Sequence, residues 1–523
     1  MVVDKGSDFA LTRKGADVQL VLSRRAGWII MNEISSITQH SEDVSDKTLA
    51  KQWRKFPWKK ARAFVKRLQT RIAKAVKNGN YRLAERLQYL LTHSYYAKVL
   101  AVHRVAGNKG RKSAGVDGEK WSTPQDKMRA VLSLSDKGYQ AKPLRRTFIP
   151  KPQSSKMRPL SIPTMYDRAM QALFAMALTP WAETIADRTS FGFRTNRSAQ
   201  DAAAYAFQCL SRKDSAQWIL EGDIKGCFDN FSHSWLLTNI PMDTRVLNQF
   251  LKAGYIFDGI LYRNESGTPQ GGIISPTLAN MALDGMEQIL KERFPGKKVH
   301  LIRFADDFLV TAESKETAAQ CKLVIIDFLK ERGLELSEEK TRIVHIDDGF
   351  DFLGWNFRKF KGKLLIKPSK KAIAAITHKL SEVIKSAKAW KQEDLIKKLN
   401  PIIRGWAMYH KTVSSSVTFQ KLDWILRNML WTWAKRRHNN KGKKWIARKY
   451  WQPTLTRKSV FKTASVTLAN FSDTKIQYRR FLKLDKNPFI DSVYFDKRPG
   501  IFLSTQKSIP CKTALEIDPD PMT

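Results

Sequence analysis

Two adjacent acidic residues interrupt an apolar, strand-like run in the second half of the chain. The letters LIRFA precede Asp306 and Asp307, and FLV follows them. Apolar residues on both sides predict a buried hairpin with the two carboxylates at its turn. Neighbouring carboxylates at the edge of a core are costly unless cations neutralise them. The pair therefore indicates a magnesium site, although an ordinary acid-rich turn between two strands has the same local pattern.

A third acid, Asp223, stands at the end of another short apolar run, which begins at Trp218. If that run is a strand beside the hairpin, the three carboxylates can hold two Mg²⁺ ions. Two such ions clamp the attacking and leaving oxygens of a phosphoryl transfer. Alone, Asp223 is weak evidence, because many strands end in Asp.

The elements that must position these acids follow from periodicity. Apolar residues recur at helical spacing in stretches 65–76 and 83–91, with Lys and Arg between them, which predicts a basic helical hairpin. Residues 140–365 mix short strand-like runs with helical stretches, as in an α/β or α+β domain. Helical stripes return in residues 370–438, where Pro401 is expected to break or kink one helix.

Composition narrows the class of partner. The 523 residues include 92 Lys or Arg and 49 Asp or Glu, a net charge of +43, and 42% are hydrophobic. The apolar fraction excludes a disordered chain, and the charge requires a polyanionic partner to offset self-repulsion. No run approaches the roughly 18 apolar residues of a membrane-spanning helix, so nucleic acid is favoured over membrane. The four Cys form no C-x-x-C pair, which indicates no zinc site and fits a reducing compartment.

Three segments in order resemble the palm of reverse transcriptases. They read DIKGCFD from Asp223, GTPQGGIISP from Gly267 and FADD from Phe304, where the family usually has Tyr. The segment FIPKP…KMRPLSIPT before them resembles the fingers of group II intron reverse transcriptases, and LNPIIRGW from Leu399 resembles their maturase domain, often called X. The similarity runs almost unbroken from about Trp53 to Arg498.

This resemblance implies roles for the acids. Asp223, Asp306 and Asp307 are the expected catalytic carboxylates and metal ligands, together with the backbone of Ile224, and the expected cofactor is two Mg²⁺ ions. Phosphoryl transfer needs mainly positioning and charge neutralisation from the protein, which such a site supplies.

The resemblance also implies a nucleotide pocket. Lys151, or alternatively Lys156, and Arg158 are expected to contact the triphosphate, because Arg can grip phosphate oxygens bidentately and Lys adds a point charge. Phe228 is expected beneath the sugar, where a bulky ring rejects a ribose 2′-OH, and Gln270 against the nucleotide and template. Leu353 and Gly354 fall in the block that forms the primer grip. The alternatives are exposed basic residues and a buried core Phe.

Basic and aromatic residues outside the palm are expected to contact nucleic acid. Those expected to bind RNA are Arg67, Arg71, Arg111, Lys112, Arg404, Tyr409 and His410. Those expected to bind DNA are Lys435, Arg436, Arg437, Lys443, Lys444 and Arg448. For the N-terminal helices a solvated charged face is the alternative, and Tyr409 and His410 can either stack on bases or pack inside the thumb, where packing is expected for Trp406.

The expected architecture is an α/β (α+β) right-hand polymerase: fingers and palm with a small antiparallel sheet, a helical thumb and a basic helical C-terminal appendage. The expected divisions are a poorly structured extension (1–45), a basic helical RNA-binding region of the fingers (46–135), fingers and palm (136–365), domain X (366–438), a DNA-binding domain (439–500) and a tail (501–523). The tail has no paired Cys, so the H-N-H endonuclease of many relatives is expected to be absent, and priming to come from a replication fork or another nick.

The expected partners are group II intron RNA, target DNA, deoxynucleotides, and an RNA template with a DNA primer, without a membrane. The setting is bacterial cytoplasm or, alternatively, an organelle. Three rivals are a splicing-only maturase, a defence or retron-type reverse transcriptase, and an RNA-templated RNA polymerase. The intact acids, the LNPIIRGW segment and Phe228 respectively disfavour them.

Overall fold

The computed structural model describes residues 45–150, 157–455 and 457–498. Its N-terminal helices surround α7, which is buried along most of its length. The apolar stripe of Val65, Leu68 and Ile72 turns one face of α3 toward this core and leaves the Lys and Arg side chains outside. The helices of this layer are α2 (Asp46–Arg54), α3 (Trp58–Lys77), α4 (Tyr81–Thr92), α5 (Tyr95–Gly107), η1 (Lys109–Lys112), α6 (Pro124–Ser133) and α7 (Met165–Ile185).

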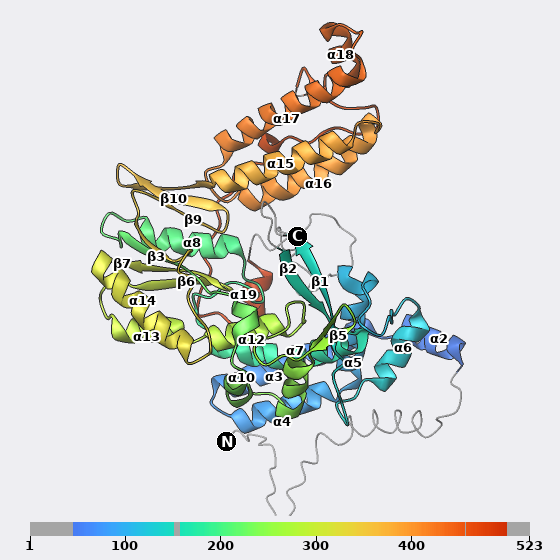
Figure 1. Ribbon diagram of the computed structural model, residues 1–523, viewed down its shortest axis with the longest axis vertical. Helices are drawn as coiled ribbons and strands as arrows, with labels where there is room; N and C mark the ends of the chain where they lie inside the picture. Colours follow the sequence, from blue (N-terminus) through green and yellow to red (C-terminus); the bar gives the residue numbers. More distant parts are fainter. Residues whose placement is uncertain (1–44, 151–156, 456, 499–523) are drawn as a thin grey trace, which may run out of the picture.

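A four-stranded sheet in the order β2-β1-β4-β5 stands beside these helices (Figure 1). Its β1 and β2 are antiparallel, β1 and β4 are parallel, and β4 and β5 form a short hairpin. The strands are β1 (Leu144–Pro150), β2 (Met157–Ile162), β4 (Tyr255–Phe257) and β5 (Ile260–Tyr262). This sheet carries the segment that was expected to form the fingers.

A second, antiparallel sheet has the order β6-β7-β3-β8 and is covered by helices on both faces. Alternation decides which side chains meet which helix: Ile219 and Leu309 share a core with α8, whereas Leu220 and Phe308 share one with α14. In Figure 1, α8 lies on one side of the sheet, with α13 and α14 on the other. The elements are α8 (Ala199–Leu210), β3 (Trp218–Asp223), α13 (Met286–Arg293), β6 (His300–Phe304), β7 (Asp307–Ala312), α14 (Lys315–Lys330) and β8 (Arg342–His345).

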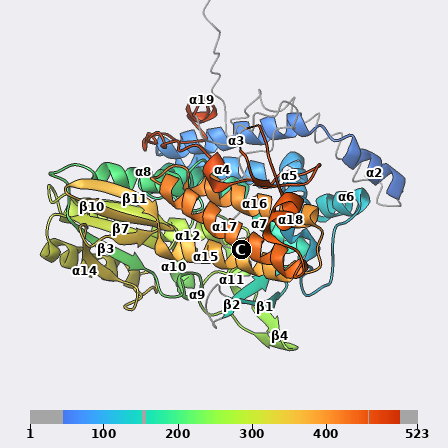
Figure 2. The same cartoon turned by 90° about the horizontal axis from the view of Figure 1, so that it is seen from above.

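Shorter helices connect these two sheets. They are α9 (Cys227–Asn230), α10 (His233–Asn239), α11 (Thr244–Lys252) and α12 (Ser275–Leu283). The third sheet, β11-β10-β9, leads from the second sheet into a bundle of long helices that projects from the rest of the molecule (Figures 1 and 2). Its elements and those of the bundle are β9 (Phe350–Phe352), β10 (Trp355–Phe360), β11 (Lys363–Pro368), α15 (Lys370–Ser386), α16 (Gln392–His410), α17 (Ser416–Arg437) and α18 (Lys443–Tyr450).

Helix α16 continues through Pro401, so the expected break is absent. A proline removes one helical hydrogen bond and frees the carbonyl four residues earlier. Pro401 and Lys397 are both exposed, so water can satisfy that carbonyl. The neighbouring Asn400 side chain bonds the backbone of Thr467 and Ala469, which ties the helix to the chain that follows the bundle.

Beyond α18 the chain returns across the molecule to the N-terminal helices. Thr70 of α3 donates to the carbonyl of Phe489, and Asn487 donates to Thr184 of α7. The elements here are short: β12 (Trp451–Gln452), β13 (Val460–Phe461), η2 (Phe471–Asp473) and α19 (Ser492–Asp496). Apart from η2 and α19, the described chain beyond α18 is therefore non-helical.

The expected basic helical hairpin is confirmed as α3 and α4, and the mixed α/β region as the first two sheets with their helices. Among the described residues no helix has the length and apolar character needed to cross a membrane. Residues 1–44 and 499–523, which hold most of the expected extension and the whole expected tail, lie outside the described ranges.

Candidate active site

The expected acidic hairpin is formed by β6 and β7. Phe304 pairs with Asp307, so Ala305 and Asp306 make the two-residue turn, with Ala305 at a positive φ of 57°. Strand β3 pairs with β7 on its other side, and Asp223 lies directly opposite Asp307. The structure therefore brings together three acids from two separate strand ends, as the sequence predicted.

Burial and the negative charges of neighbouring acids make Asp306 and Asp307 hard to ionise. Burial is the largest cause that raises the pKa of Asp307, to about 7, followed by the negative charges of Asp306 and Asp223. The pKa of Asp306 is also raised, first by burial and then by Asp223. Asp223 and Asp307 share a side-chain hydrogen bond. The site therefore has an unmet demand for positive charge.

Lys340 supplies part of that charge, and sequence reasoning missed it. Its Nζ donates to Oδ2 of Asp223 at 2.5 Å, and this hydrogen bond is the largest cause of the raised pKa of Lys340. The backbone N–H of Ser337 donates to the Asp223 carbonyl at 2.8 Å, which fixes the segment that carries Lys340. Within the described ranges no three His, Cys, Asp or Glu side chains form a ready-made metal cluster.

A cavity of about 260 Å³ lies in front of Phe228 and Gln270. Its wall combines the start of α9, the loop before α12 and the strands of the first sheet. Phe228 and Gln270, which were predicted to line one pocket, therefore line the same cavity. The carbonyl of Gln270 accepts a hydrogen bond from Ser161 N at 2.8 Å. Gly271, at φ +109°, lies so close to β2 that a Cβ at this position would stand 2.6 Å from the carbonyl oxygen of Ser161.

Arginines surround the same region. The pKa of Asp306 is raised mainly by burial, and the positive charge of Arg158 on β2 offsets a small part of that rise, which places the predicted phosphate ligand within electrostatic reach of the acids. Arg146 lines the cavity with its guanidinium 3.7 Å from the centre of the Tyr255 ring, and sequence reasoning missed it. Lys151 and Lys156 lie outside the described residues.

Leu353 and Gly354, the predicted primer grip, form the turn between β9 and β10. Both have positive φ, 51° and 79°. The Tyr409 hydroxyl donates to the Leu353 carbonyl at 2.9 Å, and Ser369 N donates to that of Gly354 at 3.0 Å. The turn is therefore tied to helix α16 and to the start of α15.

The structure corrects the RNA contact predicted for His410. Its side chain is only 2% exposed and packs against Trp355 and Trp406. Burial lowers its pKa to about 3, so the ring stays neutral. Tyr409 stacks on Trp355 with ring centroids 4.7 Å apart, so it too packs on protein. Apolar periodicity cannot tell a ring stacked inside a bundle from one offered to a base.

The remaining residues predicted to bind nucleic acid are exposed. They are Arg67, Arg71, Arg111, Lys112, Arg404, Lys435, Arg436, Arg437, Lys443, Lys444 and Arg448. Their exposure leaves these side chains available to phosphates.

Three family models match the chain. A reverse transcriptase (RNA-dependent DNA polymerase) domain matches residues 149–357, which include the strands from β2 to β8. The N-terminal domain of reverse transcriptase matches residues 53–134, and a group II intron maturase-specific domain matches residues 373–451.

Individual proteins show the same likeness. The group II intron-encoded protein LtrA of Lactococcus lactis subsp. cremoris is 31% identical over 344 residues, which are 52% of this chain and 56% of that protein. Protein YkfC of Escherichia coli K12 is 31% identical over 294 residues, 47% of this chain and 76% of YkfC. The chain thus spans little more than half the length of the lactococcal relative. A telomerase structure from Candida albicans aligns at a TM-score of 0.36 with 13% identity, over 59% of this chain and 64% of the telomerase.

Proposed function

Because the chain belongs to the family of group II intron-encoded reverse transcriptase/maturase proteins, we propose that it copies RNA into DNA and binds its own intron RNA to promote splicing. The observation that carries the polymerase part is the pairing of Asp223 with Asp307 beside the turn that holds Asp306. The fingers and palm would occupy residues 136–365, and domain X, acting as the thumb, residues 366–438.

Two Mg²⁺ ions would be held by Asp223, Asp306, Asp307 and the backbone carbonyl of Ile224. The donor set fits, because it consists of hard oxygens, and the pKa values of Asp306 and Asp307 are raised by burial and by neighbouring negative charge, which bound cations would offset. Three carboxylates are enough to bind the ions, because the protein need not supply every ligand. Mg²⁺ normally completes its coordination shell with water and substrate phosphates. Bound ions would supply charge neutralisation at the attacking and leaving oxygens.

The chain's own residues would position the reactants. Arg158, with Lys151, would grip the triphosphate, and Arg146 would add a further positive charge at the cavity wall. Phe228 would lie beneath the sugar and Gln270 beside the nucleotide and template. The Leu353–Gly354 turn would hold the primer terminus, and its hydrogen bonds to the thumb would make that grip respond to thumb position.

The exposed basic residues would contact nucleic acid. Intron RNA would lie against Arg67 and Arg71 of α3, against the loop that carries Arg111 and Lys112, and near Arg404. Target DNA would be held by the basic end of α17 and by α18, within a DNA-binding region of residues 439–500. By shielding the repulsion between phosphates, these residues would stabilise the folded intron RNA. The complex of protein and intron RNA would then insert the intron into DNA and copy it, in the bacterial cytoplasm.

An Asp306→Ala variant tests the assignment. Extension of a DNA primer on an RNA template with deoxynucleotides should fall to background, whereas protein-assisted splicing of the intron should continue. Asp348→Ala removes an exposed acid from the turn before β9 and should preserve both activities. Persistent extension by Asp306→Ala would refute the catalytic role, and no extension by the unaltered chain would refute the polymerase assignment.

A further inference from the structure

The segment between α7 and α8 runs along the back of the acidic hairpin. Phe191 N donates to the Arg303 carbonyl at 2.8 Å, and Arg303 N donates to the Thr189 carbonyl at 3.0 Å. Ser190 forms a parallel bridge with Arg303. The segment thus pairs with β6 like a short additional strand. The paired residue of β6, Arg303, lies three residues before Asp306. Gly192 then passes so close to the turn that a Cβ would stand 2.8 Å from the carbonyl carbon of Phe304.

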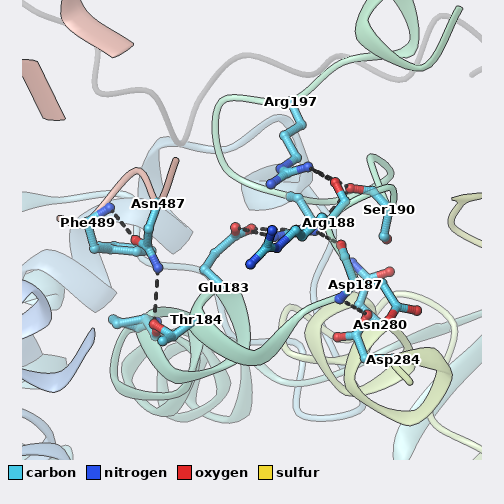
Figure 3. Close-up of polar contacts among 12 residues, drawn as sticks. Glu183, Thr184, Asp187, Arg188, Ser190, Arg197, Asn280, Asp284, Asn487 and Phe489 are labelled. Atoms are coloured by element: carbon cyan, nitrogen blue, oxygen red, sulfur yellow. Dashed lines mark hydrogen bonds and ion pairs between the residues drawn. The ribbon is translucent and has the colours of Figure 1, made fainter. Parts of the chain in front are cut away.

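A buried polar network holds this segment on both sides of Phe193. Arg194 makes two hydrogen bonds to Glu183, at 3.0 and 2.8 Å, with both side chains 4% exposed. Arg194 also donates to the carbonyl of Ser190. Asn280 of α12 donates to the carbonyl of Gly192 at 2.8 Å. Figure 3 shows Glu183, Ser190 and Asn280 among the polar residues of this region. The backbone on each side of Phe193 is therefore fixed by contacts that do not involve its ring.

Phe193 itself is strained and exposed. Its φ is +56°, a region that residues other than Gly adopt only when the surroundings impose it, and such strain gathers at functional sites. Its ring is 56% exposed, so it serves no core. The ring does touch one residue of the proposed nucleotide pocket: it meets Phe228 edge to face, with centroids 6.3 Å apart and an interplanar angle of 79°.

We infer that Phe193 is a positioning residue for sugar selection, which sets the place of the Phe228 ring against the incoming nucleotide. This inference rests on the proposed polymerase function and on Phe228 as the ring beneath the sugar. Phe228 is only half-buried and stands at the edge of an open cavity, so a ring supported on one side alone could tilt away from a ribose 2′-OH. The ring of Phe193 blocks that tilt, and the hydrogen bonds on either side of it keep Phe193 in place.

The test is the ratio of kcat/KM for a deoxynucleotide to that for the matching ribonucleotide, measured by single-nucleotide incorporation. Phe193→Ala should lower this ratio by about tenfold, the scale of one aromatic pair. Phe193→Tyr keeps the ring and should restore the ratio. Phe207→Ala removes another exposed aromatic, on α8, and should leave the ratio unchanged. A structural role would instead lower the melting temperature and incorporation of both nucleotides together.

A double variant decides whether Phe193 acts through Phe228. Discrimination by Phe193→Ala/Phe228→Ala should equal that of Phe228→Ala alone, because a support has no effect once the supported ring is gone. An unchanged ratio in Phe193→Ala while Phe228→Ala accepts ribonucleotides would overturn the inference, and so would additive effects in the double variant. Absence of all incorporation by the unaltered chain would overturn the proposed polymerase function instead.

Discussion

Replacing Gly192 by Ala probes how tightly the turn that carries Asp306 is held by the segment beside it. The added Cβ would stand 2.8 Å from the carbonyl carbon of Phe304 and closer still to Ala305 N, whereas ordinary contacts begin at 3.4 Å. Both neighbours are backbone atoms, which no side-chain rotation can remove. The turn that carries Asp306 must therefore shift by more than about 0.6 Å.

Such a shift has a predictable kinetic cost. A misplacement of about 1 Å at reacting groups can cost about 10²-fold in rate, so we expect kcat for nucleotide addition to fall between about tenfold and 10²-fold. The assay is single-turnover primer extension at saturating template–primer and deoxynucleotide. Binding of intron RNA, which does not use the turn, should be unaffected.

Gly405→Ala is the matched control. Gly405 lies within α16 with no atom within 4 Å of an added Cβ, so Ala should leave extension unchanged and slightly raise helix stability. A Gly192→Ala protein that folds, binds RNA and extends primers at the normal rate would show that the segment behind the hairpin does not control the position of the acids.

Two further predictions concern charge. Asp201→Ala should lower the free energy of unfolding by about 3–5 kcal/mol in denaturant titrations, because it leaves Arg479 and Arg498 without their buried partner; a change within the error would contradict this. The folded-state pKa of Asp307, about 7, exceeds its ordinary value of 3.8. In the metal-free protein, ionisation of this group should therefore lower the free energy of unfolding as pH rises from about 4 to 7. Mg²⁺ favours the carboxylate, so the rise in melting temperature on adding Mg²⁺ should grow from pH 5 to pH 8, and should be flatter with pH in Asp307→Asn; equal stabilisation at both pH values would refute the assignment.

The positions of the three acids at strand ends could be predicted from the sequence, because each depends on a pattern only a few residues long. Apolar residues on either side of Asp306 and Asp307 are sufficient to indicate the hairpin, and the run from Trp218 indicates the strand that ends at Asp223. The resemblance to reverse transcriptases predicted that this hairpin and this strand lie side by side. The pairing of β3 with β7 then sets which residues face each other. The basic hairpin of α3 and α4 was equally readable from its 3.6-residue period.

The contacts that tune the site could not be predicted in this way. Lys340 reaches Asp223 across 117 residues of chain, and Arg146 enters the cavity only because β1 lies beside β4. Phe193 has a positive φ between two neighbours that are held by distant residues, Gly192 by Asn280 of α12 and Arg194 by Glu183 of α7, and neither contact has a local signature. The prediction for His410 was wrong for the opposite reason: the aromatic residues near it in the sequence suggest a surface for stacking on bases, but the ring is buried between Trp355 of β10 and Trp406 of α16.

The central claim is that the three carboxylates hold the ions of a polymerase. Its most direct test is anomalous scattering from Mn²⁺ in crystals of the chain with an RNA template, a DNA primer and a non-hydrolysable deoxynucleotide. We expect two peaks at coordination distance from the carboxylates of Asp223, Asp306 and Asp307. Peaks elsewhere, or none beside these carboxylates while nucleotide is bound, would contradict the account.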